Sequence, residues 1–185
     1  MIVLGINAFH GDASSCVIRD GEVVAAIEEE RFTRIKHWAG FPFHSIDFCL
    51  NEAGLSFNDV DYFAIGRDPY AKWFWKFSFL LRQGLWNPIG VINRMQNQKK
   101  VIRLEDELAH IASLPRDFFK GKILHIEHHR SHLASAFFAS PFQESACLSI
   151  DGSGDFSTTM TAFGKGTDIT VLDSIDFPQI GRAHV

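Results

Sequence analysis

Cysteine is scarce in this chain, and the three cysteines that it has are far apart. Cys16, Cys49 and Cys147 lie inside apolar segments, and no CxxC pair is present. The sequence therefore indicates neither a disulfide framework nor a zinc site of paired cysteines. Isolated cysteines of this kind are typical of reduced thiols in the core of a cytoplasmic protein, which is the localisation that we expect.

Long apolar runs and a strong charge of either sign are also missing. No stretch reaches the ~18 apolar residues that a membrane-spanning helix needs. Met1 is followed directly by a strand-like run, without the basic and apolar regions of a signal peptide. The formal net charge is -4, which argues against a general nucleic-acid surface. We expect no membrane partner and no nucleic-acid partner.

The composition that remains is that of an ordinary globular protein. Of the 185 residues, 46% are hydrophobic and 22% are charged. This length allows one domain with a substantial core, or one lobe and the beginning of another.

Apolar runs and turn residues predict an alternation of strands and helices. Strands are expected at residues 2–6, 13–18, 23–27, 61–66 and 122–127, and a helix at 42–54. Asp20 and Gly21 have the signature of a tight hairpin, and Gly54 is the expected end of the helix. Three antiparallel strands followed by alternating helix and strand is the order of an actin, sugar-kinase or Hsp70-type lobe.

The pattern begins again near Asp151. Strands are expected at residues 146–150, 157–163 and 169–175, with a turn at 164–166. We therefore predict an α/β chain with a first lobe at residues 1–145 and the start of a second lobe at 146–179. In such folds the first hairpin turn and a later Asp-Gly turn face each other across a phosphate. Residues 7–14 and 151–157 are the candidates here.

Residues 69–116 are less regular, and we expect them to form a helical insert. The segment 73–81 is rich in aromatic residues, 97–100 is polar and basic, and 101–114 is predicted to be an amphipathic helix. An inserted subdomain that packs its aromatic side chains on the core is the preferred interpretation. A membrane-surface element or a groove for an apolar acceptor is the alternative.

A cluster of histidines follows the strand at 122–127. His128 and His132 are four residues apart at the start of a predicted helix, where two imidazoles on one face can bind a divalent metal. His129 competes with His128 as the partner of His132, and spacing alone does not decide between them. Asp151 ends a strand and opens a glycine-rich turn that can offer a carboxylate and backbone N–H groups. Purely structural roles, such as caps and carbonyl contacts, are the other interpretation of these histidines.

Four motifs in order resemble those of the O-carbamoyltransferases, the nodulation-protein-U-type enzymes and their antibiotic-tailoring relatives. They are GINAFHGDAS at residues 5–14, EEERFTRIKH at 28–37, EHHRSHLASAF at 127–137 and SIDGSGD at 149–155. The resemblance covers residues 1–179. It implies a Kae1-like domain of the actin/Hsp70 (ASKHA) superfamily, followed by a C-terminal YrdC-like domain that lies outside this chain; a homodimer is also possible.

The resemblance also implies an activity and its ligands. Carbamoyl phosphate and ATP would be converted through carbamoyl-adenylate, and the carbamoyl group would pass to a hydroxyl of a sugar or natural product. A metal, typically iron, would be held by His128, His132 and Asp151. The segment made of Asp151, Gly152, Ser153, Gly154 and Asp155 would bind the cofactor phosphates.

Candidate catalytic residues lie in the first two motifs. Acyl transfer needs cations where phosphate charge develops and a base near the acceptor hydroxyl. Four residues of the second motif could supply the cations: Arg31, Arg34, Lys36 and His37, of which the last three are our catalytic candidates. The alternative is that residues 28–36 form a solvated strand edge with ion pairs. His10 and Asp12 are candidates for orienting the substrate or accepting its proton, with turn capping by Asp12 as the alternative.

Other functions remain in competition at this stage. A tRNA threonylcarbamoyltransferase-like enzyme shares the HxxxH pattern, and a sugar kinase or ATPase shares the superfamily. A binding module without activity is the least favoured. Residues 180–185 resemble a translated adapter sequence, so we expect a non-native tail, an incomplete second lobe and exposed apolar surface at 169–177.

Overall fold

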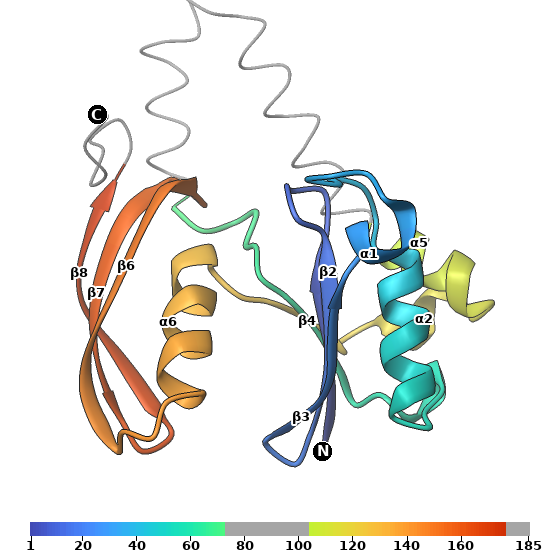
Figure 1. Ribbon diagram of the computed structural model, residues 1–185, viewed down its shortest axis with the longest axis horizontal. Coiled ribbons are helices and arrows are strands. Elements are labelled where there is room, and N and C mark those ends of the chain that lie inside the picture. Colours follow the sequence, from blue (N-terminus) through green and yellow to red (C-terminus); the bar gives the residue numbers. More distant parts are fainter. Residues whose placement is uncertain (73–103, 177–185) are drawn as a thin grey trace, which may run out of the picture. The chain divides into compact units, whose positions relative to one another are not determined.

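The computed structural model describes residues 1–72 and 104–176. The chain has a mixed α/β fold that divides into two compact units (Figure 1). Unit 1 comprises Met1–Gly66 and Gly84–His125, and unit 2 comprises Arg67–Gln83 and Ile126–Val185. Among the described residues, every helix falls short of the length and apolar character needed to cross a membrane.

Unit 1 is built on a five-stranded sheet in the order β3-β2-β1-β4-β5. The strands are β1 (Ile2–Asn7), β2 (Ser14–Arg19), β3 (Glu22–Glu28), β4 (Tyr62–Ile65) and β5 (Ile123–His125). The first three strands pair antiparallel, whereas β4 and β5 add to β1 in parallel. All five coincide with predicted strands to within two residues at each end.

One hydrophobic core joins the helices of unit 1 to this sheet. The helical elements are α1 (Glu30–Thr33), α2 (Phe43–Glu52), α5 (Leu104–Ala112) and the 3-10 turns η1 (Phe57–Asp59) and η2 (Arg116–Phe119). Leu4 and Ile6 of β1 are buried against Ile46 of α2 and Leu108 of α5. Each such side chain contributes about 1.5–3 kcal/mol by leaving water.

The first hairpin has the geometry that its sequence predicts. Asp20 and Gly21 have φ angles of 52° and 91°, and they lie between the paired residues Arg19 and Glu22. A two-residue loop with two positive φ angles matches the twist of the flanking strands, and Asp-Gly adopts it readily.

Helix α2 ends at Glu52, and Gly54 forms the stop just beyond it, as predicted. Gly54 has a φ of 64°, and its amide donates to the carbonyl of Asn51 at 3.0 Å. The next amide, of Leu55, donates to the carbonyl of Leu50 at 2.9 Å. This pair of bonds is a Schellman motif, which satisfies the last carbonyls of the helix.

The start of α2 is held by a carboxylate from a distant residue. Glu29 is only 1% exposed. Its Oε1 accepts from the amide of His44 at 3.2 Å and from His44 Nδ1 at 2.6 Å, and its Oε2 accepts from the amide and the hydroxyl of Ser45 at 2.8 and 2.7 Å. Burial raises the pKa of Glu29, but these hydrogen bonds lower it by more, so the net shift is downward.

Unit 2 is a three-stranded antiparallel sheet with one helix on it (Figure 1). Its elements are α6 (His128–Phe138), β6 (Glu144–Gly154), β7 (Ser157–Lys165) and β8 (Asp168–Asp176). Leu133 of α6 packs with Met160 and Ala162 of β7. A Cβ at Gly164 would lie 2.7 Å from the ring of Phe137, so the glycine lets the helix approach the sheet closely.

The glycine-rich segment after Ile150 was predicted as a turn, and this is wrong. Strand β6 continues through Gly154, with an irregularity in its pairing to β7 between Ile150 and Gly154. The chain turns at Asp155 and Phe156, which have φ angles of 48° and 79°. Within this segment Gly154 pairs with Ser157 of β7, so the strand regains its pairing just before the chain turns.

Other expected boundaries also move. The compact units divide after His125, not between residues 145 and 146, because α6 packs on the sheet that follows it. The turn between β7 and β8 is at residues 166–167, and β3 leads into the short helix α1 instead of a long strand edge. The amphipathic helix predicted at 101–114 is seen as α5, while the aromatic segment 73–81, the basic segment 97–100 and the tail 180–185 lie outside the described residues.

Apolar side chains are exposed on the sheet of unit 2. Leu172 is 67% exposed and Ile175 is 37% exposed. Both belong to the segment 169–177, where exposed apolar surface was predicted, although Phe177 itself is not among the described residues.

Candidate metal centre

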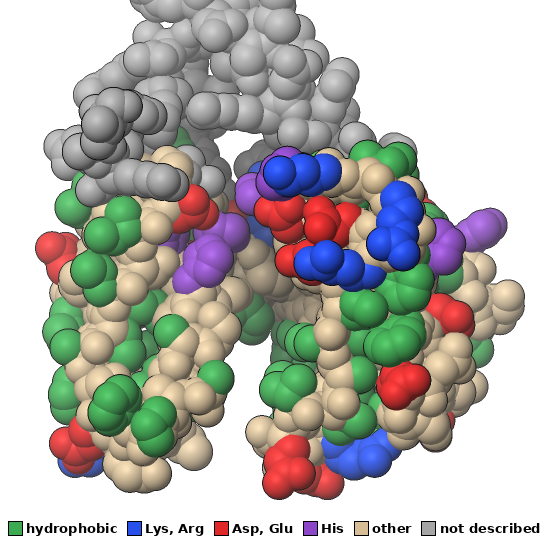
Figure 2. Space-filling view, in the orientation of Figure 1, with side chains coloured by type: hydrophobic (Ala, Val, Ile, Leu, Met, Phe, Trp, Pro, Cys, Tyr) green, Lys and Arg blue, Asp and Glu red, His purple; other side chains and the backbone are tan. Residues whose placement is uncertain are grey.

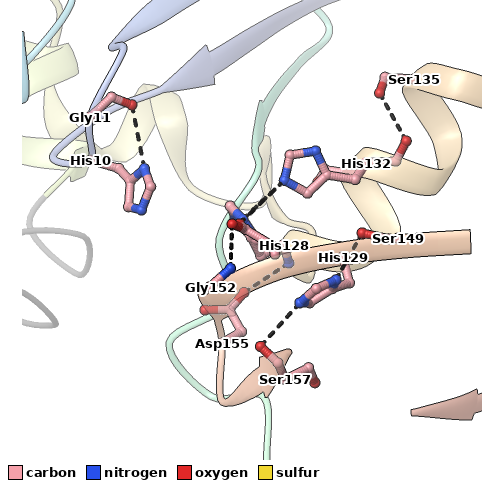
Figure 3. A network of polar contacts seen from close by, with 12 residues as sticks. His10, Gly11, His128, His129, His132, Ser135, Ser149, Gly152, Asp155 and Ser157 are labelled. Atoms are coloured by element: carbon pink, nitrogen blue, oxygen red, sulfur yellow. Dashed lines mark hydrogen bonds and ion pairs between the residues drawn. The ribbon is translucent and has the colours of Figure 1, made fainter. Parts of the chain in front are cut away.

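Helix α6 presents two imidazoles on one face, one turn apart. His128 is the first residue of the helix, and His132 follows four residues later. Their ring centroids are 4.6 Å apart with the planes nearly perpendicular, and their Nε2 atoms are 3.0 Å apart (Figure 3). The i, i+4 spacing therefore brings the two nitrogens together.

Asp151 of β6 adds a carboxylate to the two imidazoles. Its Oδ2 lies 2.9 Å from His128 Nε2 and 3.8 Å from His132 Nε2, while its Oδ1 accepts from the Gly152 amide at 2.5 Å. The hydrogen bond from His128 is the largest effect on Asp151 and lowers its pKa, against the smaller opposing effect of burial. The carboxylate is therefore ionised near neutral pH.

The three side chains fit a divalent cation by their donor atoms and spacing. All three donor atoms lie within 4.8 Å of one another. Donors about 2.0–2.2 Å from a shared cation would be about 3.0–3.6 Å apart, close to the spacings of 2.9, 3.0 and 3.8 Å found here. Two imidazoles and a carboxylate suit iron, zinc and similar metals.

Hydrogen bonding alone fits this arrangement poorly. His128 Nε2 faces both the Asp151 carboxylate and His132 Nε2, but an imidazole nitrogen carries either one hydrogen or one lone pair. If it donates to the carboxylate, its single hydrogen must be shared with His132 Nε2, which bends both hydrogen bonds. A cation at the centre would bind the lone pairs of both nitrogens and the oxygen together.

His129 points away from this cluster and is not part of it. The side chain is fully buried, with Nδ1 2.8 Å from Ser149 Oγ and Nε2 3.0 Å from the carbonyl oxygen of Ser157. Both ring nitrogens are engaged, so the ambiguity between His128 and His129 is resolved in favour of His128. The metal-binding role of the three residues itself stays a prediction.

The segment expected to bind phosphates supports the cluster instead. A Cβ at Gly154 would lie 1.9 Å from His128 Cδ2, so only glycine leaves room for that ring. Asp155 Oδ2 accepts from the amide of His128 at 2.9 Å and from that of Asp68 at 2.8 Å, which caps the start of α6. Gly152 is exposed, and phosphate binding by this segment stays a prediction.

Sequence reasoning missed these supporting roles. Gly154 and Asp155 were noted only as parts of a phosphate turn, and Glu29 only as one acid in a charged run. The glycine at 154 was the single available signal, because a glycine in a strand often marks a close approach. Nothing in the local sequence distinguishes Glu29 from Glu28 and Glu30, which are only partly buried.

Unit 1 brings together two of its five candidate catalytic residues. His37 Nδ1 lies 2.8 Å from Asp12 Oδ1, and both residues have positive φ angles, of 56° and 63°. His10 Nδ1 is 3.3 Å from the carbonyl oxygen of Gly11. These contacts lie on the connection between β1 and β2 and on the segment after α1.

Arg34 and Lys36 are exposed on the same unit. Acidic and basic side chains gather together on the part of unit 1 near α1 (Figure 2). Arg31 contributes ion pairs with Glu28 at 3.4 Å and Glu30 at 3.8 Å. The segment thus has the ion pairs that the structural interpretation expected, between the end of β3 and the helix α1. The catalytic roles stay predictions.

Known proteins resemble this chain over almost its entire length. The family described as carbamoyltransferase N-terminus matches residues 2–184. An uncharacterized protein of Synechocystis is 37% identical over 181 residues, which are 95% of this chain and 29% of that protein. The nodulation protein NolNO of Sinorhizobium fredii is 33% identical over 177 residues, which are 94% of this chain and 24% of that protein.

Among solved structures, YeaZ from Pseudomonas aeruginosa aligns with a TM-score of 0.48 and 14% identity, over 99% of this chain and 70% of that chain. The chain spans only about a quarter to three tenths of the length of the two curated relatives. The family match nevertheless includes all three donors of the candidate metal centre and nearly every other residue. The chain therefore belongs to the carbamoyltransferase N-terminal family.

Proposed function

We propose that this chain is the N-terminal part of an ATP-dependent O-carbamoyltransferase. The carbamoyl group would move from carbamoyl phosphate, through carbamoyl-adenylate, to a hydroxyl of a sugar or natural product. The observation that carries the proposal is the convergence of His128, His132 and Asp151 in a chain of the carbamoyltransferase N-terminal family. A C-terminal YrdC-like domain of the same protein would be its partner.

The strand order supports an ASKHA-type, Kae1-like lobe. In unit 1, three antiparallel strands continue into two parallel strands, in the order β3-β2-β1-β4-β5. In unit 2, the antiparallel strands β6, β7 and β8 repeat the first part of that order. The second sheet is accordingly proposed as the beginning of a second lobe.

The candidate metal centre would anchor phosphate groups. A divalent metal such as iron, bound there, supplies a Lewis acid for phosphate oxygens. The chain's own residues hold the donors: Gly152 donates to Asp151, and Asp155 fixes the helix start that carries His128. Such outer contacts orient the ligands and keep the carboxylate ionised.

The polar residues of unit 1 fit the acyl-transfer step. Its contact with Asp12 suits His37 to the role of base, in place of the cation expected from the sequence. When His37 donates its Nδ1–H to Asp12, its Nε2 carries the lone pair and can accept the proton of an acceptor hydroxyl. Arg34 and Lys36 would attract phosphate charge, and His10 would orient the substrate.

The proposed reaction has three steps: hydrolysis of carbamoyl phosphate, formation of carbamoyl-adenylate and transfer of the carbamoyl group. Water cleaves carbamoyl phosphate to carbamate and phosphate, and a carbamate oxygen then attacks the α-phosphorus of ATP while pyrophosphate leaves. The acceptor oxygen attacks the carbamoyl carbon, its proton goes to the base, and AMP leaves. Pyrophosphate release is therefore the signature that separates this chemistry from phosphoryl transfer.

The test uses the complete protein, with labelled ATP, with and without carbamoyl phosphate. We expect pyrophosphate only when carbamoyl phosphate is present, and we expect His132→Ala to lose the carbamoyl step. Release of ADP without carbamoyl phosphate would show a kinase or ATPase instead. Full activity of His132→Ala would contradict only the role of the metal centre.

A further inference from the structure

His129 is a polar side chain in the interior of unit 2. It is 0% exposed and ranks among the largest fully buried side chains of the described residues. It lies on α6 between the two histidines of the candidate metal centre, and its ring is directed into the sheet (Figure 3). A buried imidazole costs free energy unless both nitrogens are satisfied, so its contacts decide its role.

Both nitrogens have partners with matching hydrogen-bond roles. A carbonyl oxygen only accepts, so Nε2 must donate to the Ser157 carbonyl at 3.0 Å. In the neutral ring Nδ1 is then an acceptor, and Ser149 Oγ, at 2.8 Å, donates to it. The two bonds select one tautomer and one ring orientation.

These bonds connect the elements that supply the three donors. His129 follows His128 directly and precedes His132 by three residues on α6. Ser149 precedes Asp151 by two residues on β6, and side chains two apart on a strand lie on the same face. Ser157 begins β7, which pairs with β6. One side chain thus links the helix with two donors to the strand with the third.

We propose that His129 is a positioning residue that sets the rotation of α6 about its axis, and so holds the three donors in register. The apolar contacts of Leu133 keep the helix on the sheet, but such contacts are not directional. Successive residues of a helix differ by about 100° in direction, so a small rotation displaces His128 and His132 from Asp151. Two directional bonds, to Ser149 and Ser157, oppose that rotation.

The inference rests on the proposed metal centre, and Co²⁺ is the probe for its test. Titration of the chain with Co²⁺, followed by visible absorption, gives both an affinity and a ligand-field spectrum. We expect His129→Leu to weaken Co²⁺ binding by about tenfold or more and to alter the spectrum. His129→Gln, which can both donate and accept, should restore much of the affinity.

Leu133→Ala is the matched control, because it removes a buried side chain of the same helix without touching the hydrogen bonds. It should lower the melting temperature but leave the affinity and spectrum close to those of the wild type. Ser149→Ala removes one partner of His129 and should give a smaller loss in the same direction as His129→Leu, even where His129→Leu folds poorly. Equal losses in Leu133→Ala and His129→Leu, or a wild-type spectrum in His129→Leu, would overturn the proposal.

A readout without metal separates this inference from the metal centre itself. In the metal-free chain, proton NMR should detect contacts between the rings of His128 and His132, whose centroids are 4.6 Å apart. These contacts should be lost in His129→Leu and kept in Leu133→Ala. If the wild type binds no Co²⁺, the metal centre is refuted, and the contact between the two rings becomes the test of the positioning role. Its survival in His129→Leu would overturn that role.

Discussion

Each unit begins a helix at a carboxylate from a distant residue, but the two helix starts differ in where their histidine points. In unit 1, the amide and the imidazole of His44 both donate to the same carboxylate, Glu29. In unit 2, the amide of His128 donates to Asp155, while its imidazole faces a second carboxylate, Asp151.

That difference separates a structural contact from a candidate site. The imidazole of His44 is used to complete a cap around a buried charge. The imidazole of His128 instead meets a carboxylate and another imidazole, with His132 52% exposed at the edge of the cluster. Converging donors at an accessible position, and not merely a histidine beside an acid, are what metal binding requires.

Removal of donors should give the largest effect and the sharpest test of this comparison. We expect His128→Ala, His132→Ala and Asp151→Asn each to abolish measurable Co²⁺ binding, since three donors leave no redundancy. His44→Ala, which removes a histidine that also contacts a carboxylate, should keep wild-type affinity. Calorimetric titration measures the Co²⁺ affinity of the donor variants and of His44→Ala. An equal loss of affinity in His44→Ala would contradict the difference between the two helix starts.

Glu29→Ala should strongly destabilise unit 1. It removes a buried carboxylate and leaves the amide donors of His44 and Ser45 without their acceptor, a loss of about 2–4 kcal/mol in the free energy of unfolding. Glu28→Ala is the neighbouring control, because the side chain of Glu28 is 45% exposed and its ion pair with Arg31 contributes about 0–1 kcal/mol. Urea unfolding compares them, and similar losses for both would show that Glu29 is not a cap.

Gly154→Ala should disturb the site in unit 2 more than the fold. A methyl group 1.9 Å from His128 Cδ2 forces the ring to move, so we expect about a tenfold loss of Co²⁺ affinity and about 1–3 kcal/mol of strain. At Gly152 nothing lies within 4 Å of an added Cβ, and Gly152→Ala should have little effect. Co²⁺ affinity and thermal unfolding, measured for both variants, test the close approach of Gly154 to His128. Wild-type Co²⁺ affinity in Gly154→Ala would contradict it.

The smallest expected effect is the pH dependence of the Glu29 cap. The pKa of Glu29 is lowered in the folded protein from its ordinary value of 4.5. Its stabilisation is therefore fully present above the unfolded value and is lost as the pH falls through the folded value. The difference in unfolding free energy between wild type and Glu29→Gln should shrink below about pH 4.5, and a constant difference from pH 7 to pH 3 would contradict this origin.

Local pattern was sufficient for much of the fold. Asp20-Gly21 predicts its hairpin and Gly54 its helix end, because each requires a positive φ that few residues adopt. Alternating apolar residues predict the strands, and the i, i+4 spacing predicts that His128 and His132 share a helix face. These features depend only on neighbours along the chain, which is why the sequence alone determines them.

The tertiary structure decided the features that depend on residues far apart in the chain. The choice between His128 and His129 follows from how α6 is rotated on its sheet. In the interior, His129 forms hydrogen bonds with Ser149 and Ser157. The burial of Glu29 follows from the packing of α2 beside it, where the amide of Ser45 donates to its carboxylate. In both cases partners 15 or more residues away supply the hydrogen bonds, and spacing along the sequence does not indicate that these residues meet.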